Sequence, residues 1–286
     1  MTASPFGSTL SVGGFVAASE AGLRPLQQVQ GSSIVSLGRQ QNPSRRMRGA
    51  LAPQKMEGVF GSTQVYYPRG SLTAQEYLNE GGWVELEERT AAYNSARTGA
   101  LARLRKAAAE AGAFAVVDVR VRSGRFEQAV RAIEFTAIGT AVASDRFESD
   151  DALPLTSLSG GELWKLLAAG AWPIGLVGGT SVVYVVAGLR TKYARFRLSR
   201  RSLRNQEYED YTNGLVAARR RAMGRLNREA RAAEATGVLG IKVGRERREQ
   251  QDENLLVTVD VLGTAIVRVE RAAPIDVQAA IDLGAS

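Results

Sequence analysis

The sequence repeats itself, and this repeat constrains the fold more than any other feature. Several short motifs of the first half return in the same order in the second half. The matched segments are Leu10–Phe15 and Leu158–Leu163, Ala21-Gly22 and Ala169-Gly170, Pro25-Leu26 and Pro173-Ile174, Gly31–Val35 and Gly179–Val183, and Gly139-Thr140-Ala141 and Gly263-Thr264-Ala265. Collinear matches of this kind indicate a duplicated structural unit. The sequence therefore predicts two homologous domains.

Both copies are expected to contain a short helix, a strand, a long helix and two further strands, in that order. These segments are 11–21, 26–37, 87–111, 115–122 and 132–143 in the first copy, and 159–169, 174–186, 208–234, 238–244 and 255–269 in the second. Each short helix begins at a serine suited to an N-cap and ends at Ala-Gly. The order predicts an α+β fold with two small domains, each a short antiparallel-rich sheet with a long helix packed on one face.

Glycines recur at matching places inside the expected strands. Gly31 and Gly179 lie in the first strand of each copy, and Gly139 and Gly263 lie in the last. A glycine inside a strand weakens it unless the backbone bulges or another segment approaches closely. We therefore expect a bulge or a close backbone contact at each position.

The repeat also sets the expected domain boundaries. The first repeat spans 1–143 and carries an insertion at about 40–67 that the second copy lacks. A short acidic linker spans 144–154, the second repeat spans 155–271, and a tail spans 272–286.

The chain contains neither cysteine nor histidine, which removes several kinds of chemistry. Hydrolases that depend on a histidine base and zinc sites built from Cys and His are excluded. Oxygen ligands remain, and these suit hard cations such as Mg²⁺. The acidic run at Glu80, Glu85, Glu87 and Glu88 is explained without a ligand, because carboxylates in the first turn of a helix offset its dipole. The sequence predicts no catalytic residues, no metal site and no cofactor, and therefore no enzyme.

An uncharged stretch from Leu166 to Leu189 is long enough to cross a membrane. The matching stretch of the first copy, 18–37, carries Glu20 and Arg24, so the repeated unit is expected to fold in water. Pro173 and the glycines after it also indicate a helix end, a turn and a strand. We predict no membrane span, and since no signal peptide is evident at the N-terminus, a cytoplasmic location.

The long helices and the strands after them resemble the YbjQ-type family, whose domain is labelled heavy-metal-binding. In the first copy the resemblance lies in Ala96-Arg97, Ala100-Leu101, Arg103-Leu104, Gly112–Val119 and Gly139-Thr140-Ala141. In the second it lies in Arg219, Ala222-Met223, Arg225-Leu226, Glu229-Ala230, Ala235–Ile241 and Gly263-Thr264-Ala265. The opening pattern of each copy looks like that of tandem actinobacterial members.

The resemblance implies α+β units that assemble into closed rings, typically pentamers. A tandem chain would then form a pseudo-symmetric ring or two stacked rings. The metal label does not carry over to these residues, because the usual Asp of the family's Gly-Ala-Asp motif is Phe114 in the first copy and Thr236 in the second.

Arginine is concentrated before and along the second long helix, in a chain of net charge +8. Such a surface is typical of proteins that bind nucleic acid or anionic lipid. The alternative is a solvated helix face whose arginines pair with acidic groups such as Glu229. The candidate residues for polyanion binding are Arg195, Arg197, Arg200, Arg201, Arg204, Arg219, Arg220, Arg221, Arg225 and Arg228.

Narrow alanine-rich helix faces and small sheets with open edges favour association between copies. The candidate residues for an oligomer interface are Ala100, Leu101, Leu104, Ala108, Met223, Leu226, Trp164 and Trp172. We therefore predict a non-enzymatic homo-oligomer, a ring or shell that serves as a scaffold or binds a partner. The alternatives are an arginine-rich polyanion-binding protein and, ranked last, a carboxylate-dependent enzyme.

Overall fold

The computed structural model describes residues 7–37, 54–57, 63–66, 81–129, 132–144, 153–192, 207–244, 247–251 and 254–268. The predicted insertion at 40–67 contributes only a two-stranded hairpin to the described part, formed by β2 (Gln54–Glu57) and β3 (Thr63–Tyr66). The predicted tail, 272–286, and most of the linker lie outside the described residues.

The first half forms an antiparallel sheet in the order β1-β6-β5. Its strands are β1 (Leu23–Ser36), β5 (Ala115–Arg125) and β6 (Ala132–Ser144). The long helix α4 (Glu87–Glu110) packs on β1 and β6, and the short helix α1 (Val12–Glu20) precedes β1. The last strand of the copy, β6, therefore lies in the middle of its sheet.

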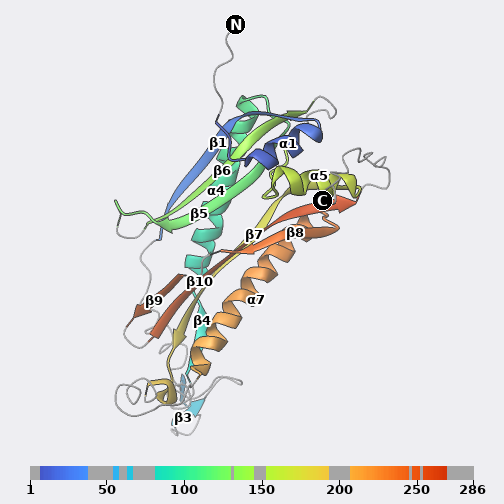
Figure 1. Ribbon diagram of the computed structural model, residues 1–286. Helices are drawn as coiled ribbons and strands as arrows, with labels where there is room; N and C mark the ends of the chain where they lie inside the picture. Colours follow the sequence, from blue (N-terminus) through green and yellow to red (C-terminus); the bar gives the residue numbers. More distant parts are fainter. Residues whose placement is uncertain are drawn as a thin grey trace, which may run out of the picture.

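The second half repeats this arrangement, with its core strands in the order β7-β10-β8 (Figure 1). The strands are β7 (Ala171–Val186), β8 (Gly237–Val243) and β10 (Asn254–Arg268), with β9 (Arg247–Gln251) paired to β10. The helices are α5 (Gly160–Ala168) and α7 (Glu209–Ala232). The equivalent strand orders agree with the predicted duplication, and the predicted α+β fold is confirmed.

The glycines inside the first strand of each copy make the close backbone contacts that the sequence predicts. A Cβ added to Gly31 would collide with the carbonyl oxygen of Ala100 in α4, and a Cβ on Gly179 would collide with that of Ala222 in α7. The absent side chains therefore let each long helix lie directly on its sheet. This contact also explains why the helix faces are rich in alanine.

A β-bulge occurs at the same place in both sheets. Asp118 in β5 and Gly240 in β8 have positive φ angles of 50° and 59°. The bulge brings the strand so close to its neighbour that a Cβ on Gly139 would lie 2.6 Å from Val116 Cγ1, and one on Gly263 would lie 2.6 Å from Val238 Cγ1. The glycine of each Gly-Thr-Ala motif is required by this approach.

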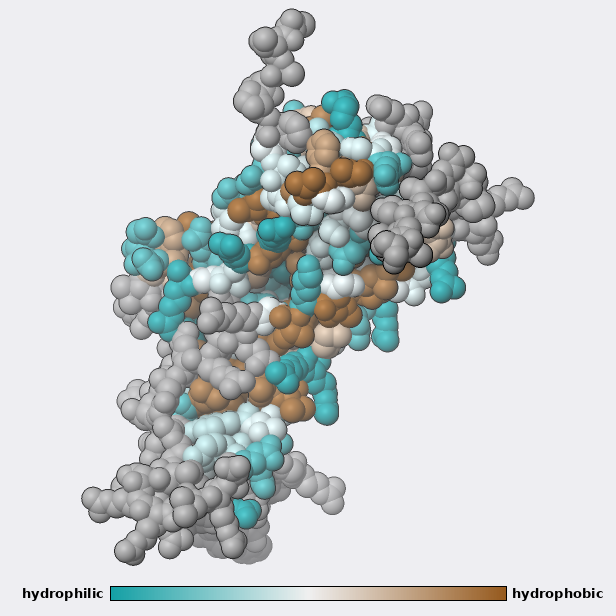
Figure 2. Space-filling view, viewed as in Figure 1, coloured by the Kyte–Doolittle hydropathy of each residue, from teal (hydrophilic) through white to brown (hydrophobic). Residues whose placement is uncertain are grey.

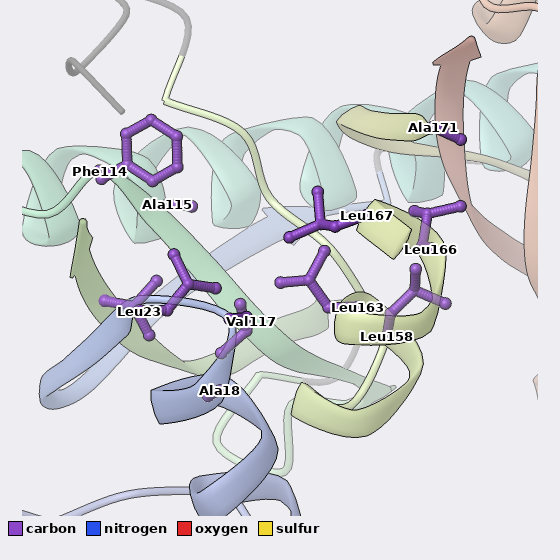
Figure 3. Packing of buried hydrophobic residues seen from close by; sticks show 12 residues of the cluster. Ala18, Leu23, Phe114, Ala115, Val117, Leu158, Leu163, Leu166, Leu167 and Ala171 are labelled. Atoms are coloured by element: carbon purple, nitrogen blue, oxygen red, sulfur yellow. The ribbon is translucent and has the colours of Figure 1, made fainter. Parts of the chain in front are cut away.

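One hydrophobic cluster draws residues from both halves. Leu23 and Val117 of the first half pack in it with Leu158 and Leu163, which belong to the second (Figure 3). The two sheets therefore share part of their core. The uncharged stretch 166–189 is divided between α5, β7 and the residues that follow them, and none of the helices described here is long and apolar enough to span a membrane.

Candidate functional site

The two halves exchange backbone segments where they meet. Strand β4 (Gly82–Glu85), which precedes α4, leaves the first half and pairs antiparallel with β7. In return, the segment Leu153–Leu158 runs parallel to β5: Val116 N–H donates to the carbonyl of Pro154 (3.0 Å), and Val119 N–H donates to that of Thr156 (2.9 Å). Each half thus covers an edge of the other half's sheet. We call this contact the internal junction.

The outer edge of β7 continues to be satisfied by first-half residues after β4 ends. Val182 N–H donates to Thr90 Oγ1 (3.0 Å), and its carbonyl accepts from Leu86 N–H (2.8 Å). One turn beyond Thr90, the side-chain amide of Asn94 bonds both backbone groups of Thr180. It accepts from the N–H at 3.0 Å and donates to the carbonyl at 3.1 Å. The helix side chains therefore take the place of a neighbouring strand.

Glu85 is the central charge of the internal junction. Its side chain is 7% exposed and accepts from Arg225 (2.8 Å), Arg221 (3.2 Å) and Ser181 Oγ (2.6 Å), all in the second half. Burial alone raises the pKa of Glu85, but the hydrogen bonds from Arg225 and Ser181 and the charges of both arginines outweigh it and lower the pKa below its ordinary value. The carboxylate therefore stays ionised between the two halves.

Two further contacts surround this ion pair. The guanidinium of Arg221 lies 5.0 Å from the ring centre of Trp83, a cation–π contact. Arg97 of α4 pairs with Glu229 of α7, whose second carboxylate oxygen accepts from Gly178 N–H (2.9 Å). The junction is thus held by backbone pairing, charge and aromatic contacts together.

The arginines predicted to bind polyanions are divided by this geometry. Arg221 and Arg225 turn toward Glu85, as the alternative interpretation of paired arginines supposes. Arg219, Arg220 and Arg228 are exposed on α7. The others, Arg195, Arg197, Arg200, Arg201 and Arg204, lie outside the described residues. Polyanion binding stays a prediction.

The apolar residues predicted for an oligomer interface lie mostly inside the protomer. Ala100, Leu104, Ala108 and Leu226 are at most 1% exposed, packed beneath their own sheets. Leu101 is partly buried against the cluster of Leu104, and Met223 against that of Leu226. Trp164 and Trp172 are partly buried against the cluster that both halves share. The ring of Trp172 also meets Phe114 edge-on, with centroids 5.7 Å apart. Any interface between copies therefore needs other residues as well.

Sequence reasoning missed the role of Glu85, which it placed in a helix N-terminus together with Glu87 and Glu88. Those two do lie in the first turn of α4, but Glu85 lies on β4 and faces arginines far along the chain. Spacing gives no signal for such a contact. The isolated tryptophan two residues earlier, Trp83, was the available hint, because a lone aromatic on a short strand needs a partner surface.

A hydroxyl cluster fixes the segment before each short helix. Thr9 N–H donates to Thr140 Oγ1 (2.9 Å) in the first half, and Ser157 N–H donates to Thr264 Oγ1 (3.1 Å) in the second. Thr140 and Thr264 are the threonines of the two Gly-Thr-Ala motifs. These threonines therefore anchor the two segments in equivalent positions, although only the second segment pairs with a strand of the other half.

Exposed apolar side chains gather on α1 and β8. Val12 and Val16 of α1 are 85% and 50% exposed, and Leu239, Ile241 and Val243 of β8 are 41%, 42% and 53% exposed. Figure 2 shows hydrophobic surface over both elements. Clustered exposure of this kind marks interaction sites rather than the ordinary scatter of apolar residues on a surface.

The donor groups of the described residues do not form a metal centre. No three His, Cys, Asp or Glu side chains in that part of the chain gather closely enough to hold an ion. Asp260, which faces a cavity at the junction, accepts hydrogen bonds from Ser123 Oγ (2.9 Å) and Thr180 Oγ1 (2.7 Å). Asp260 therefore bonds hydroxyls of both halves.

Comparison with known proteins identifies one similar chain and one family. An encapsulin nanocompartment protein of Mycobacterium tuberculosis is 28% identical over 242 residues, which make up 82% of this chain and 76% of that protein. The model of the YbjQ-type family, described as "Putative heavy-metal-binding", matches residues 81–145 and 175–269. The description does not fit the ligands available, because the chain has no Cys or His with which to bind a soft metal ion. The two matches nevertheless cover more than half of the chain and fall one in each half, so the chain belongs to the YbjQ-type family and carries its domain in tandem.

Proposed function

We propose that this protein is a non-catalytic, self-assembling scaffold whose copies form a ring or shell. The relative from Mycobacterium tuberculosis is named as a nanocompartment protein, and a compartment needs a wall built from many copies. The shared family and the similarity over most of the chain support the same role here.

The observation that carries the proposal is the apolar surface on α1 and β8. An isolated protomer would leave Val12, Val16, Leu239, Ile241 and Val243 in water. Burying apolar surface contributes about 25 cal/mol per Å². Both elements are regular secondary structure, a helix and a strand. An exposed apolar surface on such elements is suited to contact with another protein.

We propose further that the repeats span 1–143 and 155–271, joined by 144–154, and that each lends a short segment to the other at the internal junction. In the assembly these repeats would act as the units of a pseudo-symmetric ring, for which a pentamer-like geometry is the first model. A cytoplasmic location is part of this proposal.

The test is the mass of the untagged protein in solution. Light scattering at micromolar concentration is expected to give one species whose mass is a defined multiple of 30.7 kDa, and negative-stain electron microscopy is expected to show closed particles. A monomer at all concentrations up to about 100 µM, where even weak specific contacts associate, would overturn the proposal. Polydisperse aggregates without closed particles would overturn it as well.

A further inference from the structure

The internal junction shows how the outer edge strand of one sheet is covered by a segment of the other half. Strand β5 of the first sheet is paired along its outer edge by the segment Leu153–Leu158. Its equivalent in the second sheet, β8, is the last strand of the described sheet on that side. The two strands share the bulge, at Asp118 and Gly240, so their residues can be matched one to one.

The matched residues differ in burial. Val117 and Val119 of β5 are 0% and 2% exposed, while their counterparts Leu239 and Ile241 are 41% and 42% exposed. Sequence and backbone are similar in the two strands, so the difference comes from the neighbour that β5 has and that β8 lacks in the described part of the chain. The exposed side chains of β8 are therefore apolar for the same reason as those of β5.

The segment that covers β5 also has a counterpart. Thr156–Leu158 precede α5, and Ser8–Leu10 precede α1 at the same distance from the helix N-cap. The Gly-Thr-Ala threonine fixes both segments through the same backbone position, Ser157 in one and Thr9 in the other. Ser8–Leu10 is therefore held on the first sheet in the same way as Thr156–Leu158 is held on the second sheet.

The remaining exposed apolar residues follow the same correspondence. Val12 of α1 matches Gly160, which packs on α1 at the internal junction so closely that a Cβ there would collide with the carbonyl oxygen of Gly14, so α1 of one copy has to lie farther from α5 of the next than α1 and α5 lie within one chain. Ile34 of β1 is 51% exposed, whereas its counterpart Val182 in β7 is 0% exposed and bonded to Thr90. Val216 of α7 is 43% exposed and matches Asn94, which bonds Thr180 across the junction. Residues that form the internal junction thus have equivalents in the other repeat that are exposed on the surface of the protomer.

We propose that copies associate head to tail by repeating the internal junction between chains. The residues Gly7–Leu10 and α1 of one copy would cover β8 of the next, with Ile34 of the first copy against α7 of the second. This inference rests on the proposed self-assembly and specifies its contact. Each copy offers two different surfaces, so the interface is heterologous rather than twofold, and it generates a closed ring when the rotation from copy to copy closes. The two repeats then alternate around one ring and do not stack in two.

Cross-linking tests this contact directly, because the natural chain has no cysteine. Val116 and Leu155 form a parallel bridge at the internal junction, and their counterparts are Val238 and Gly7. The side chain added at Gly7 would make only ordinary contacts, 3.8 Å from Gln28. The variants Gly7→Cys and Val238→Cys, carrying different tags, would be co-expressed and treated with a mild oxidant, which forms a disulfide only between cysteines whose Cα atoms lie within about 7 Å of each other.

The expected product is a covalent dimer that contains both tags, with no covalent dimer from either variant alone. The double variant should give a ladder of oligomers on a denaturing gel. Val116→Cys/Leu155→Cys, which should cross-link within one chain, is the positive control for the geometry. Gly7→Cys co-expressed with Lys106→Cys is the negative control, because Lys106 is exposed on α4, and its side chain is 79% exposed.

The outcomes separate this inference from the proposed function. A monomer by light scattering overturns both. Oligomers of defined mass that give no mixed dimer, or that give dimers from Val238→Cys alone, overturn the head-to-tail contact and leave assembly standing. As a second measurement, Ile241→Asp should reduce the oligomer to single chains while its circular dichroism stays unchanged, and an unchanged mass would contradict the contact.

Discussion

Val117 and Leu239 occupy the same place in the two sheets, yet Val117 is fully buried and Leu239 is 41% exposed. Each lies opposite the threonine of a Gly-Thr-Ala motif and immediately before a bulge residue of positive φ. The difference between them arises from neighbours, because the first sheet receives a segment of the second half and, among the described residues, the second sheet receives none on that edge. The chain thus contains two equivalent edge strands, of which β5 is covered and β8 is exposed.

Removing the charge of Glu85 should loosen the internal junction. Glu85→Gln keeps the shape of the side chain but loses the ion pairs with Arg221 and Arg225. Both arginines are partly exposed, so solvent screens the loss, and we expect the free energy of unfolding to fall by about 1–2 kcal/mol. Urea unfolding followed by tryptophan fluorescence measures it. Glu88→Gln, on the exposed first turn of α4, is the matched control and should change stability by less than about 0.5 kcal/mol.

The contribution of Glu85 should depend on pH in one direction. Its pKa in the folded protein lies below the ordinary value of 4.5. A lowered folded-state pKa means that the stabilisation is present above the pKa of the unfolded chain and is lost as the pH falls through that of the folded one. The stability difference between wild type and Glu85→Gln should therefore be constant near neutral pH and shrink below about pH 4.5. A difference that grows on acidification would contradict the assignment.

Local features of this fold follow from the sequence, whereas the internal junction does not. The serine N-caps at Ser11 and Ser159 and the glycine approaches at Gly31 and Gly179 depend on residues that are close in sequence or that recur in both copies. Pairing of Glu85 with Arg225 depends instead on how two sheets meet, and no periodicity records it.

The alanine-rich helix faces illustrate the same limit. The small side chains of Ala100 and Ala222 indicate close packing, but they do not say against what. The structure places them under their own sheets, where Gly31 and Gly179 leave room for the helix backbone. A narrow apolar face can serve an interior or an interface equally well, and only the position of the glycine on the opposing strand distinguishes the two.

Adding one methyl group at Gly31 should be costly. The Cβ of Gly31→Ala would meet the backbone of α4 at Ala100 and Leu104, which cannot move without shifting the whole helix. Overpacking of this kind costs about 1–3 kcal/mol. Gly13→Ala is the control, since a Cβ there has nothing within 4 Å and alanine favours the helix. Thermal unfolding should show a lower midpoint for the first variant and an equal or higher one for the second.

Any affinity for polyanions should depend on the exposed arginines of α7. We expect Arg220→Ala/Arg228→Ala to elute from heparin at lower salt than wild type, because exposed cations supply the salt-dependent part of such binding. Arg225→Ala should elute with wild type, because its side chain is 22% exposed and bound to Glu85. Failure of the wild-type protein to bind heparin at low salt would remove polyanion binding as an alternative function.

A charge at Val12 should separate assembly from folding. Val12 is the first residue of α1 and is 85% exposed, so Val12→Asp removes no packing within the protomer. An aspartate in the first turn offsets the helix dipole, and the variant should unfold at the same temperature as wild type or a slightly higher one. Between copies the same carboxylate would have to be buried among apolar side chains without a partner, which strongly disfavours the contact. Light scattering should therefore show single chains for Val12→Asp and the full oligomer for Thr98→Asp, a control on the exposed face of α4. If Val12→Asp assembles like wild type, then α1 does not contribute to the contact between copies.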